Sequence, residues 1–161
     1  GQPIVVEGLH ALNDSLTYML PRYEKVKISL GVLTQIRIND HNRISTSDTR
    51  IIRRMVRDQQ FRDRGPMATM DIWADVRRGE EKNIYPYQED ADTIFNTALP
   101  YELSVLKPYA EPLLESIDKG SVHYAEARRL LRFLKPFKGI DSSVVPPNSL
   151  LREFIGPDRK K

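Results

Sequence analysis

The residue types with the clearest chemical use lie in one segment, residues 50–64. The segment contains six arginines and two acids, Asp58 and Asp63, and it has no lysine. The guanidinium group is planar and donates paired hydrogen bonds that match the oxygens of a phosphate. The segment therefore favours binding of phosphate groups from two sides, by a helix face and by the loop after it. The arginines are Arg50, Arg53, Arg54, Arg57, Arg62 and Arg64.

The charge distribution singles out the same segment. The whole chain has a net charge of +3 at pH 7, whereas residues 50–64 alone have a charge of +4, because six arginines stand against two acids. The other residues are therefore slightly acidic in sum. We expect an anionic ligand at residues 50–64 and disfavour nucleic acid as a partner of the whole chain. A solvated basic face, or arginines paired with distant acids, is the alternative interpretation.

Glu7 is a candidate metal ligand. It follows the apolar run of residues 3–6 (P-I-V-V), and the β-branched run is typical of a strand buried in a parallel sheet. Ligands of α/β folds bind at the carboxyl ends of such strands, where a carboxylate can hold Mg²⁺ directly or through water. An ordinary loop glutamate is the alternative interpretation.

Several kinds of site are excluded by composition. The chain has no cysteine, which rules out disulfides, thiolate metal sites and cysteine nucleophiles. The three histidines lie far apart, at positions 10, 41 and 123, and form no zinc motif. The sequence also has no Gly-Lys dipeptide and no glycine-rich phosphate loop.

Length and hydropathy indicate an ordinary soluble domain. The chain has 161 residues, of which 40% are hydrophobic and 29% are charged, proportions typical of a globular protein. No apolar run approaches the roughly 20 residues of a membrane-spanning helix, so we expect no membrane partner. The absence of cysteine fits a reducing compartment, and the expected location is cytoplasmic.

Periodicity and turn signals predict the elements that position these residues. Strands are expected at residues 3–9, 25–32 and 93–99, and helices at 45–58, 68–78, 102–117, 121–137 and 149–155. Breaks in the helical segments are expected near Pro108 and Gly120. Strands separated by helices indicate an α/β fold with a largely parallel sheet.

The helix at residues 45–58 carries most of the arginines. Ser45 and Asp48 have the spacing of a capping box, which starts a helix. At about 100° per residue, four arginines share one face, opposite an apolar face. The arginines are Arg50, Arg53, Arg54 and Arg57, and the apolar residues are Ile51, Ile52, Met55 and Val56. Residues 61–66 are predicted to break the helix and to form a mobile loop that carries Arg62 and Arg64.

The pattern of residues 48–64, D-T-R-I-I-R-R-M-V-R-D-x-x-x-R-D-R, resembles the arginine helix and lid of the uridine kinase and phosphoribulokinase family. P-I-V-V-E-G-L at residues 3–9 resembles that family's strand ending in Glu-Gly, its Walker B equivalent. A-D-T-I-F-N at residues 91–96 resembles a later strand. Longer stretches, such as Y-E-L-S-V-L-K-P-Y-A-E-P-L-L, are similar to a bacterial branch of uridine-kinase-like nucleoside kinases.

The resemblance implies a kinase that moves the γ-phosphoryl group of ATP to the 5′-hydroxyl of a pyrimidine nucleoside, uridine or cytidine, with Mg²⁺. It implies that Glu7 lies at the metal. It implies that Arg57 and Arg62 contact the phosphates of the nucleotide, and that Arg54 and Arg64 lie near the nucleoside and the transferred phosphoryl group. The family pattern R-G-R is R-D-R here, because Asp63 replaces the glycine.

The resemblance also implies a division of the chain. The family's phosphate loop, its lysine and its hydroxyl-activating carboxylate precede the Glu-Gly strand, and none of them is in this sequence. Residues 1–117 then correspond to the C-terminal part of a P-loop kinase core, a three-layer fold with a mostly parallel sheet, and residues 118–161 to a helical C-terminal extension. We expect this chain alone to be inactive as a kinase.

Without the phosphate-loop strand, the sheet of such a fold has a gap. Two ways to close it are expected: either residues 3–9 pair directly with residues 25–32, or a second copy supplies a strand and forms a homodimer. The alternative function is a non-catalytic module whose arginine face binds RNA or an acidic partner.

Overall fold

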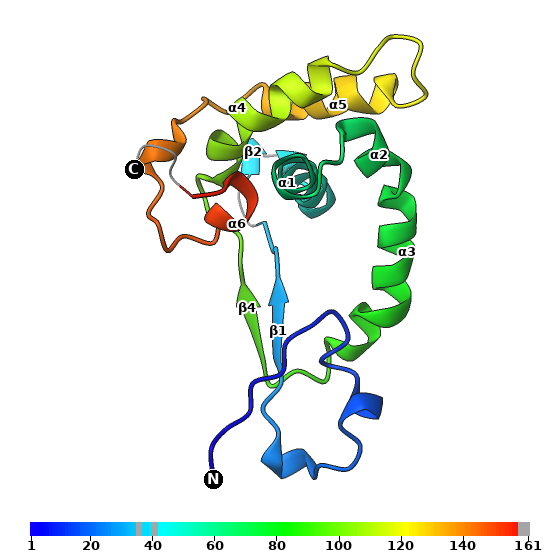
Figure 1. The fold of residues 1–161 in the computed structure, drawn as a ribbon, viewed down its shortest axis with the longest axis vertical. Coiled ribbons are helices and arrows are strands. Elements are labelled where there is room, and N and C mark those ends of the chain that lie inside the picture. Colours follow the sequence, from blue (N-terminus) through cyan, green and yellow to red (C-terminus); the bar gives the residue numbers. More distant parts are fainter. Residues whose placement is uncertain (35–36, 40–41, 158–161) are drawn as a thin grey trace. The chain divides into compact units, whose positions relative to one another are not determined.

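The computed structural model describes residues 1–34, 37–39 and 42–157 (Figure 1). The fold is mixed α/β and mainly helical, and the chain forms two compact units that alternate along the sequence. Unit 1 comprises Gly1–Gly31 and Ala74–Asn96, and unit 2 comprises Val32–Trp73 and Thr97–Lys161. The expected boundary at residue 117 falls inside unit 2.

Unit 2 is a helical unit built around α1 (Thr46–Phe61). The four apolar residues expected on one face of this helix are all buried, each with 2% or less of its surface exposed. They pack in one core with apolar side chains of α4 (Glu102–Glu115), α5 (Tyr124–Leu134) and α6 (Arg152–Ile155). In Figure 1, α4 and α5 lie side by side next to α1. Burial of this apolar face makes α1 the central helix of the unit.

The predicted start of α1 is confirmed, but its capping box is only half formed. The Ser45 side chain accepts a hydrogen bond from the backbone amide of Asp48 at 3.2 Å, as an N-cap residue does. The Asp48 carboxylate instead accepts two hydrogen bonds from Arg129 of α5, at 2.7 and 2.6 Å. The carboxylates of Glu126 and Asp48 raise the pKa of Arg129. Asp48 therefore connects α1 to α5 and does not close its own helix end.

The predicted break near Pro108 is wrong, because α4 continues through Pro108 and Pro112. A proline inside a helix costs about 3 kcal/mol, because it removes a hydrogen bond and crowds the preceding turn. The buried Leu103, Leu106 and Leu114 of α4 each stabilise the packed helix by about 1.5–3 kcal/mol. Packing therefore offsets the local preference to break.

The segment after α1 is divided more finely than expected. The break at residues 61–66 is confirmed, but the single helix expected at 68–78 is two helices, α2 (Pro66–Asp71) and α3 (Trp73–Asn83). Pro66 occupies the first turn of α2, where a missing amide hydrogen costs nothing. Before α1, β2 (Arg37–Asn39) and β3 (Asn42–Arg43) form an antiparallel pair.

Unit 1 contains a small parallel sheet. Two of the three expected strands are present in shorter form, β1 (Ile28–Gly31) and β4 (Thr93–Asn96). They pair in parallel, with Ile28 opposite Thr93 and Leu30 opposite Phe95. The prediction of an α/β fold with a parallel sheet is confirmed for these two strands.

The predicted strand at residues 3–9 is wrong. These residues form neither a strand nor a helix in the structure, and Ile4 and Val5 are 88% and 89% exposed. A strand requires a neighbour for its backbone hydrogen bonds, and the parallel sheet of the described residues consists of β1 and β4, without residues 3–9. The first way of closing the sheet, by pairing residues 3–9 with residues 25–32, is therefore also wrong.

No helix among the described residues has the length and apolar composition needed to cross a membrane.

Candidate anion-binding site

The carboxylate of Asp58 organises the end of α1. Asp58 is fully buried, and its backbone carbonyl accepts hydrogen bonds from the amides of Arg62 at 3.0 Å and Arg64 at 3.2 Å. Its side chain accepts hydrogen bonds from Arg62 Nη1 at 3.0 Å and from the Thr69 hydroxyl at 3.3 Å. Arg54 Nε lies 3.3 Å from Asp58 Oδ2. One acid therefore holds the loop after α1 and two of the predicted site arginines.

The chain turns sharply between the two loop arginines. Asp63 has φ of 47°, in the left-handed region that is rare for residues other than glycine, asparagine and aspartate. This conformation lets the backbone return so that both Arg62 and Arg64 donate to the same carbonyl of Asp58.

We call Arg54, Arg57, Arg62 and Arg64 the arginine cluster. These are the four site arginines predicted from the sequence, and they lie close enough to influence one another. The pKa of Arg54 is lowered, first by burial and then by the positive charges of Arg62, Arg57 and Arg64, while Asp58 acts in the opposite direction. The structure therefore brings the four predicted side chains into one electrostatic environment.

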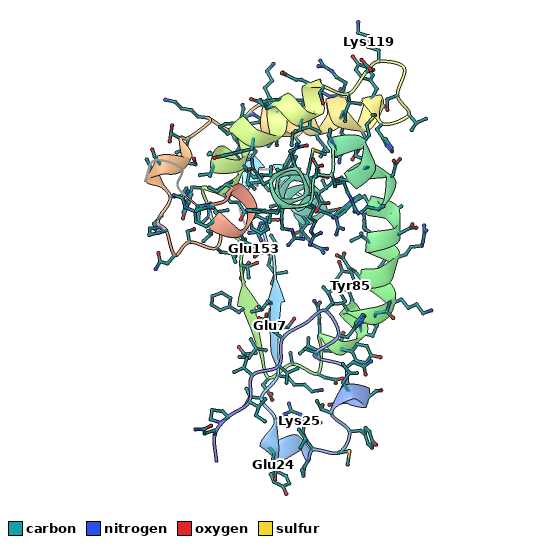
Figure 2. The ribbon with its side chains drawn as sticks, in the orientation of Figure 1. Glu7, Glu24, Lys25, Tyr85, Lys119 and Glu153 are labelled. Atoms are coloured by element: carbon teal, nitrogen blue, oxygen red, sulfur yellow. The ribbon has the colours of Figure 1, made fainter. Side chains whose placement is uncertain are left out.

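Arg57 contacts a helix from the far end of the chain. Its Nη1 donates a hydrogen bond to Glu153 Oε1 at 2.9 Å, and its guanidinium lies 5.9 Å from the centre of the Phe154 ring. Glu153 is on α6 (Figure 2) and its side chain is half exposed. Arg57 Nε is buried and has no hydrogen-bond partner among the described residues.

The arginine cluster has more positive charge than its acids neutralise. Among the described residues, the acids in ion-pair contact with its four cations are Asp58, which is buried, and Glu153, which faces solvent. The side chains of Arg57 and Arg62 are 27% and 47% exposed. Because each guanidinium has five N–H donors, several donors remain for an anion. The arrangement can bind an anion of more than one negative charge.

Arg53 has a different environment. It is 5% exposed, pairs with Glu102 and donates a hydrogen bond to the Thr97 carbonyl oxygen at 2.8 Å. Its guanidinium also lies 5.1 Å from the centre of the Phe154 ring. For Arg53 the alternative interpretation, pairing with a distant acid, therefore applies, because α1 has packed neighbours on more than one side. Arg50, the remaining member of that face, lies 6.0 Å from the centre of the Trp73 ring.

Glu7, the predicted metal ligand, lies in unit 1 and is exposed (Figure 2). The part of the chain that the structure describes contains no group of three or more histidine, aspartate or glutamate side chains arranged to hold a metal ion. Mg²⁺ is commonly held by one or two carboxylates, with the remaining ligands from substrate phosphates and water. The role of Glu7 as a metal ligand therefore stays a prediction.

Three acids with a role at this site were not recognised as site residues in the sequence. Asp58 could have been, because it stands four residues from both Arg54 and Arg62, the spacing of neighbours on a helix. Glu102 and Glu153 lie 49 and 96 positions from their arginine partners, and no local pattern connects them.

Comparisons with known proteins give no relative: no family model matches the chain, and neither a curated protein nor a solved structure is similar to it.

Proposed function

We propose that the arginine cluster binds the phosphate groups of a nucleotide. The observation that carries this proposal is that four arginines act on one another electrostatically, while the buried carboxylate of Asp58 pairs with two of them, Arg54 and Arg62. Binding of a phosphate would relieve the mutual repulsion that contributes to the lowered pKa of Arg54. Arginine suits this ligand better than lysine, because its planar donors match paired phosphate oxygens.

We further propose that the chain supplies this site to a nucleoside kinase. In such a reaction the γ-phosphoryl group of ATP is transferred to the 5′-hydroxyl of a pyrimidine nucleoside. The protein contributes mainly by positioning the groups and by neutralising the charge on the phosphoryl oxygens. Arg57 and Arg62 would contact the phosphates of ATP. Arg54 and Arg64 would stabilise the transferred group.

The remaining parts of the proposal follow the resemblance of the sequence to the uridine kinase and phosphoribulokinase family. Residues 1–117 would belong to a P-loop kinase core, with β1 and β4 as two strands of its sheet, and residues 118–161 to a helical extension. Glu7 would be one ligand of Mg²⁺, which supplies charge neutralisation between the phosphates.

The phosphate-binding part is tested by titrating the chain with ATP and with pyrophosphate, using calorimetry at low ionic strength. We expect binding, and we expect Arg62→Ala and Arg64→Ala each to weaken it by about tenfold or more, the loss of one charge-assisted hydrogen bond. The control is Arg128→Ala, which removes an exposed arginine of α5 outside the arginine cluster. Equal affinity of all three variants would refute the site.

The kinase part needs a separate assay. The full-length protein is incubated with ATP, Mg²⁺ and a panel of nucleosides, and the products are separated by chromatography. Uridine or cytidine monophosphate is the expected product. Absence of phosphorylation of any nucleoside would refute the kinase but would leave the phosphate site standing.

The charge of unit 2 favours a second candidate function, binding of RNA. Unit 2 has 19 basic and 13 acidic residues, whereas unit 1 has 6 basic and 9 acidic residues. A basic unit binds the phosphate backbone of a nucleic acid with an affinity that falls steeply as salt is added. Tight RNA binding with a steep salt dependence, and without nucleotide turnover, would support this function over the kinase.

A further inference from the structure

An acidic side chain of α6 already occupies part of the arginine cluster. Glu153 accepts a hydrogen bond from Arg57 Nη1 at 2.9 Å, although the two residues are 96 positions apart in the sequence. Carboxylate oxygens and phosphate oxygens are both acceptors for the donors of a guanidinium group. Glu153 and a bound phosphate group would therefore require the same donor of Arg57.

The core of unit 2 determines where Glu153 lies. Its neighbours Phe154 and Ile155 are 6% and 5% exposed and pack in the hydrophobic core, together with the fully buried Leu151. The centre of the Phe154 ring also lies 5.9 Å from the guanidinium of Arg57. Because α6 is anchored in this way, the Glu153 carboxylate is present beside Arg57 at a high effective concentration.

The contact between Glu153 and Arg57 is nevertheless one that a ligand can break. It consists of a single hydrogen bond, and the Glu153 side chain is 52% exposed. The ion pair between Arg129 and Asp48 in the same unit is different, because it has two hydrogen bonds and the Asp48 side chain is 13% exposed. Exposed ion pairs with one hydrogen bond contribute little to stability. The Glu153 side chain can therefore turn into solvent while Phe154 and Ile155 stay buried.

We propose that Glu153 is an internal competitor that lowers the affinity of the arginine cluster for phosphate groups, because a ligand must displace it from Arg57. This inference rests on the proposed binding of phosphate by the cluster. A polyphosphate can displace Glu153, because it contacts other members of the cluster, such as Arg54 and Arg62, at the same time as Arg57. Glu153 is then a residue that sets the affinity of the site without contacting the ligand.

The first test is a calorimetric titration of the whole chain with pyrophosphate in about 0.1 M salt, where exposed charges more than about 10 Å apart are screened from each other. Glu153→Gln keeps the size of the side chain and removes its charge. We expect this variant to bind pyrophosphate about three- to tenfold more tightly, because no ion pair must be broken and one negative charge beside the site is gone. The matched control is Glu126→Gln, which removes a glutamate that pairs with Arg129, outside the arginine cluster, and its affinity should equal that of the wild-type chain.

The second test observes the displacement directly. The ¹³C signal of the Glu153 side-chain carboxyl group is assigned by its absence from the spectrum of Glu153→Gln. The signal in Arg57→Ala, without ligand, gives the position of the unpaired carboxylate. In the wild-type chain we expect saturation with pyrophosphate to move the signal to that position. The signal of Glu126 should stay where it is.

The outcomes separate this proposal from the proposed phosphate site. If the wild-type chain binds pyrophosphate and Glu153→Gln binds it no more tightly, Glu153 is not a competitor, but the phosphate site stands. A gain in affinity without movement of the Glu153 signal would also overturn the proposal, because the gain would then be a general effect of charge. If neither the wild-type chain nor Glu153→Gln binds pyrophosphate, the phosphate site is refuted, and the competitor with it.

Discussion

Replacing Asp58 by asparagine should destabilise unit 2 and weaken the contacts that hold Arg54 and Arg62. The change removes one negative charge but keeps the size of the side chain. It leaves Arg54 partly buried beside a neutral amide, and it weakens the contacts to Arg62 Nη1 and to the Thr69 hydroxyl. Loss of one partner of a buried ion pair costs about 3–5 kcal/mol. Arg62 is about half exposed, so its share is below about 1 kcal/mol.

We therefore expect the free energy of unfolding to fall by about 2–3 kcal/mol, which corresponds to a decrease in melting temperature of about 5–10 °C. The assay is urea unfolding followed by the fluorescence of Trp73, the single tryptophan of the chain, which belongs to unit 2. Asp63→Asn is the matched control, because it removes an exposed acid five residues away and asparagine tolerates the same left-handed backbone.

The same unfolding experiment is repeated with added phosphate. An anion bound among the four arginines replaces part of the lost charge, so added phosphate should stabilise Asp58→Asn more than it stabilises the wild-type chain. The reasoning is refuted if Asp58→Asn unfolds at the same urea concentration as Asp63→Asn, because the buried carboxylate would then contribute nothing beyond its charge.

Three further predictions address catalysis, pH and the start of α1. If the proposed kinase activity is present, alanine at any member of the arginine cluster should lower kcat by about 10²-fold or more, as loss of a positioned cation does. An unchanged kcat of all four variants in a nucleoside phosphorylation assay would indicate an ordinary basic surface. Contacts to Lys27 and to Arg22 lower the pKa of Asp14 and Asp92, respectively. Each contact is therefore fully present above about pH 4 and is lost as the pH falls through the lowered pKa. We expect amide hydrogen exchange in unit 1 to become faster in acid, and an exchange rate that is the same from pH 5 to pH 2, after correction for the intrinsic rate, would contradict this. Ser45→Ala should lower the free energy of unfolding by about 1 kcal/mol, because the N-cap of α1 is lost. The control in the same urea experiment is Ser143→Ala, which replaces an exposed serine in a short turn.

Local patterns predicted the parts of the fold that local interactions determine. The cap at Ser45 and the apolar face of α1 were correct, because a helix start and a 3.6-residue period depend on residues a few positions apart. Two of the expected strands and the parallel direction of the sheet were also correct, although the strands are shorter than expected and their direct pairing was not predicted. The residues of the arginine cluster were identified for the same reason, because they share one helix and its loop.

Contacts between distant segments explain why other predictions from the sequence were wrong. Residues 3–9 have the composition of a buried strand, yet a strand forms only where a neighbour accepts its hydrogen bonds. Pro108 was expected to end a helix, but packing of α4 in the core of unit 2 outweighs that preference. Arg53 was expected on the same face as the other arginines of α1, and its partner Glu102 lies 49 positions away. None of these partners can be identified from spacing alone.

The turn at Asp63 has a consequence for how the loop sequence can vary. At φ of 47°, glycine is the residue with no steric cost, and aspartate is one of the few others that adopt this conformation. Aspartate at this position therefore allows the same chain path as glycine would. Aspartate instead of glycine leaves the backbone conformation unchanged but lowers the local positive charge, because it places a carboxylate next to Arg62 and Arg64. A change from aspartate to glycine at this position would therefore alter the charge beside the two arginines without altering the shape of the loop.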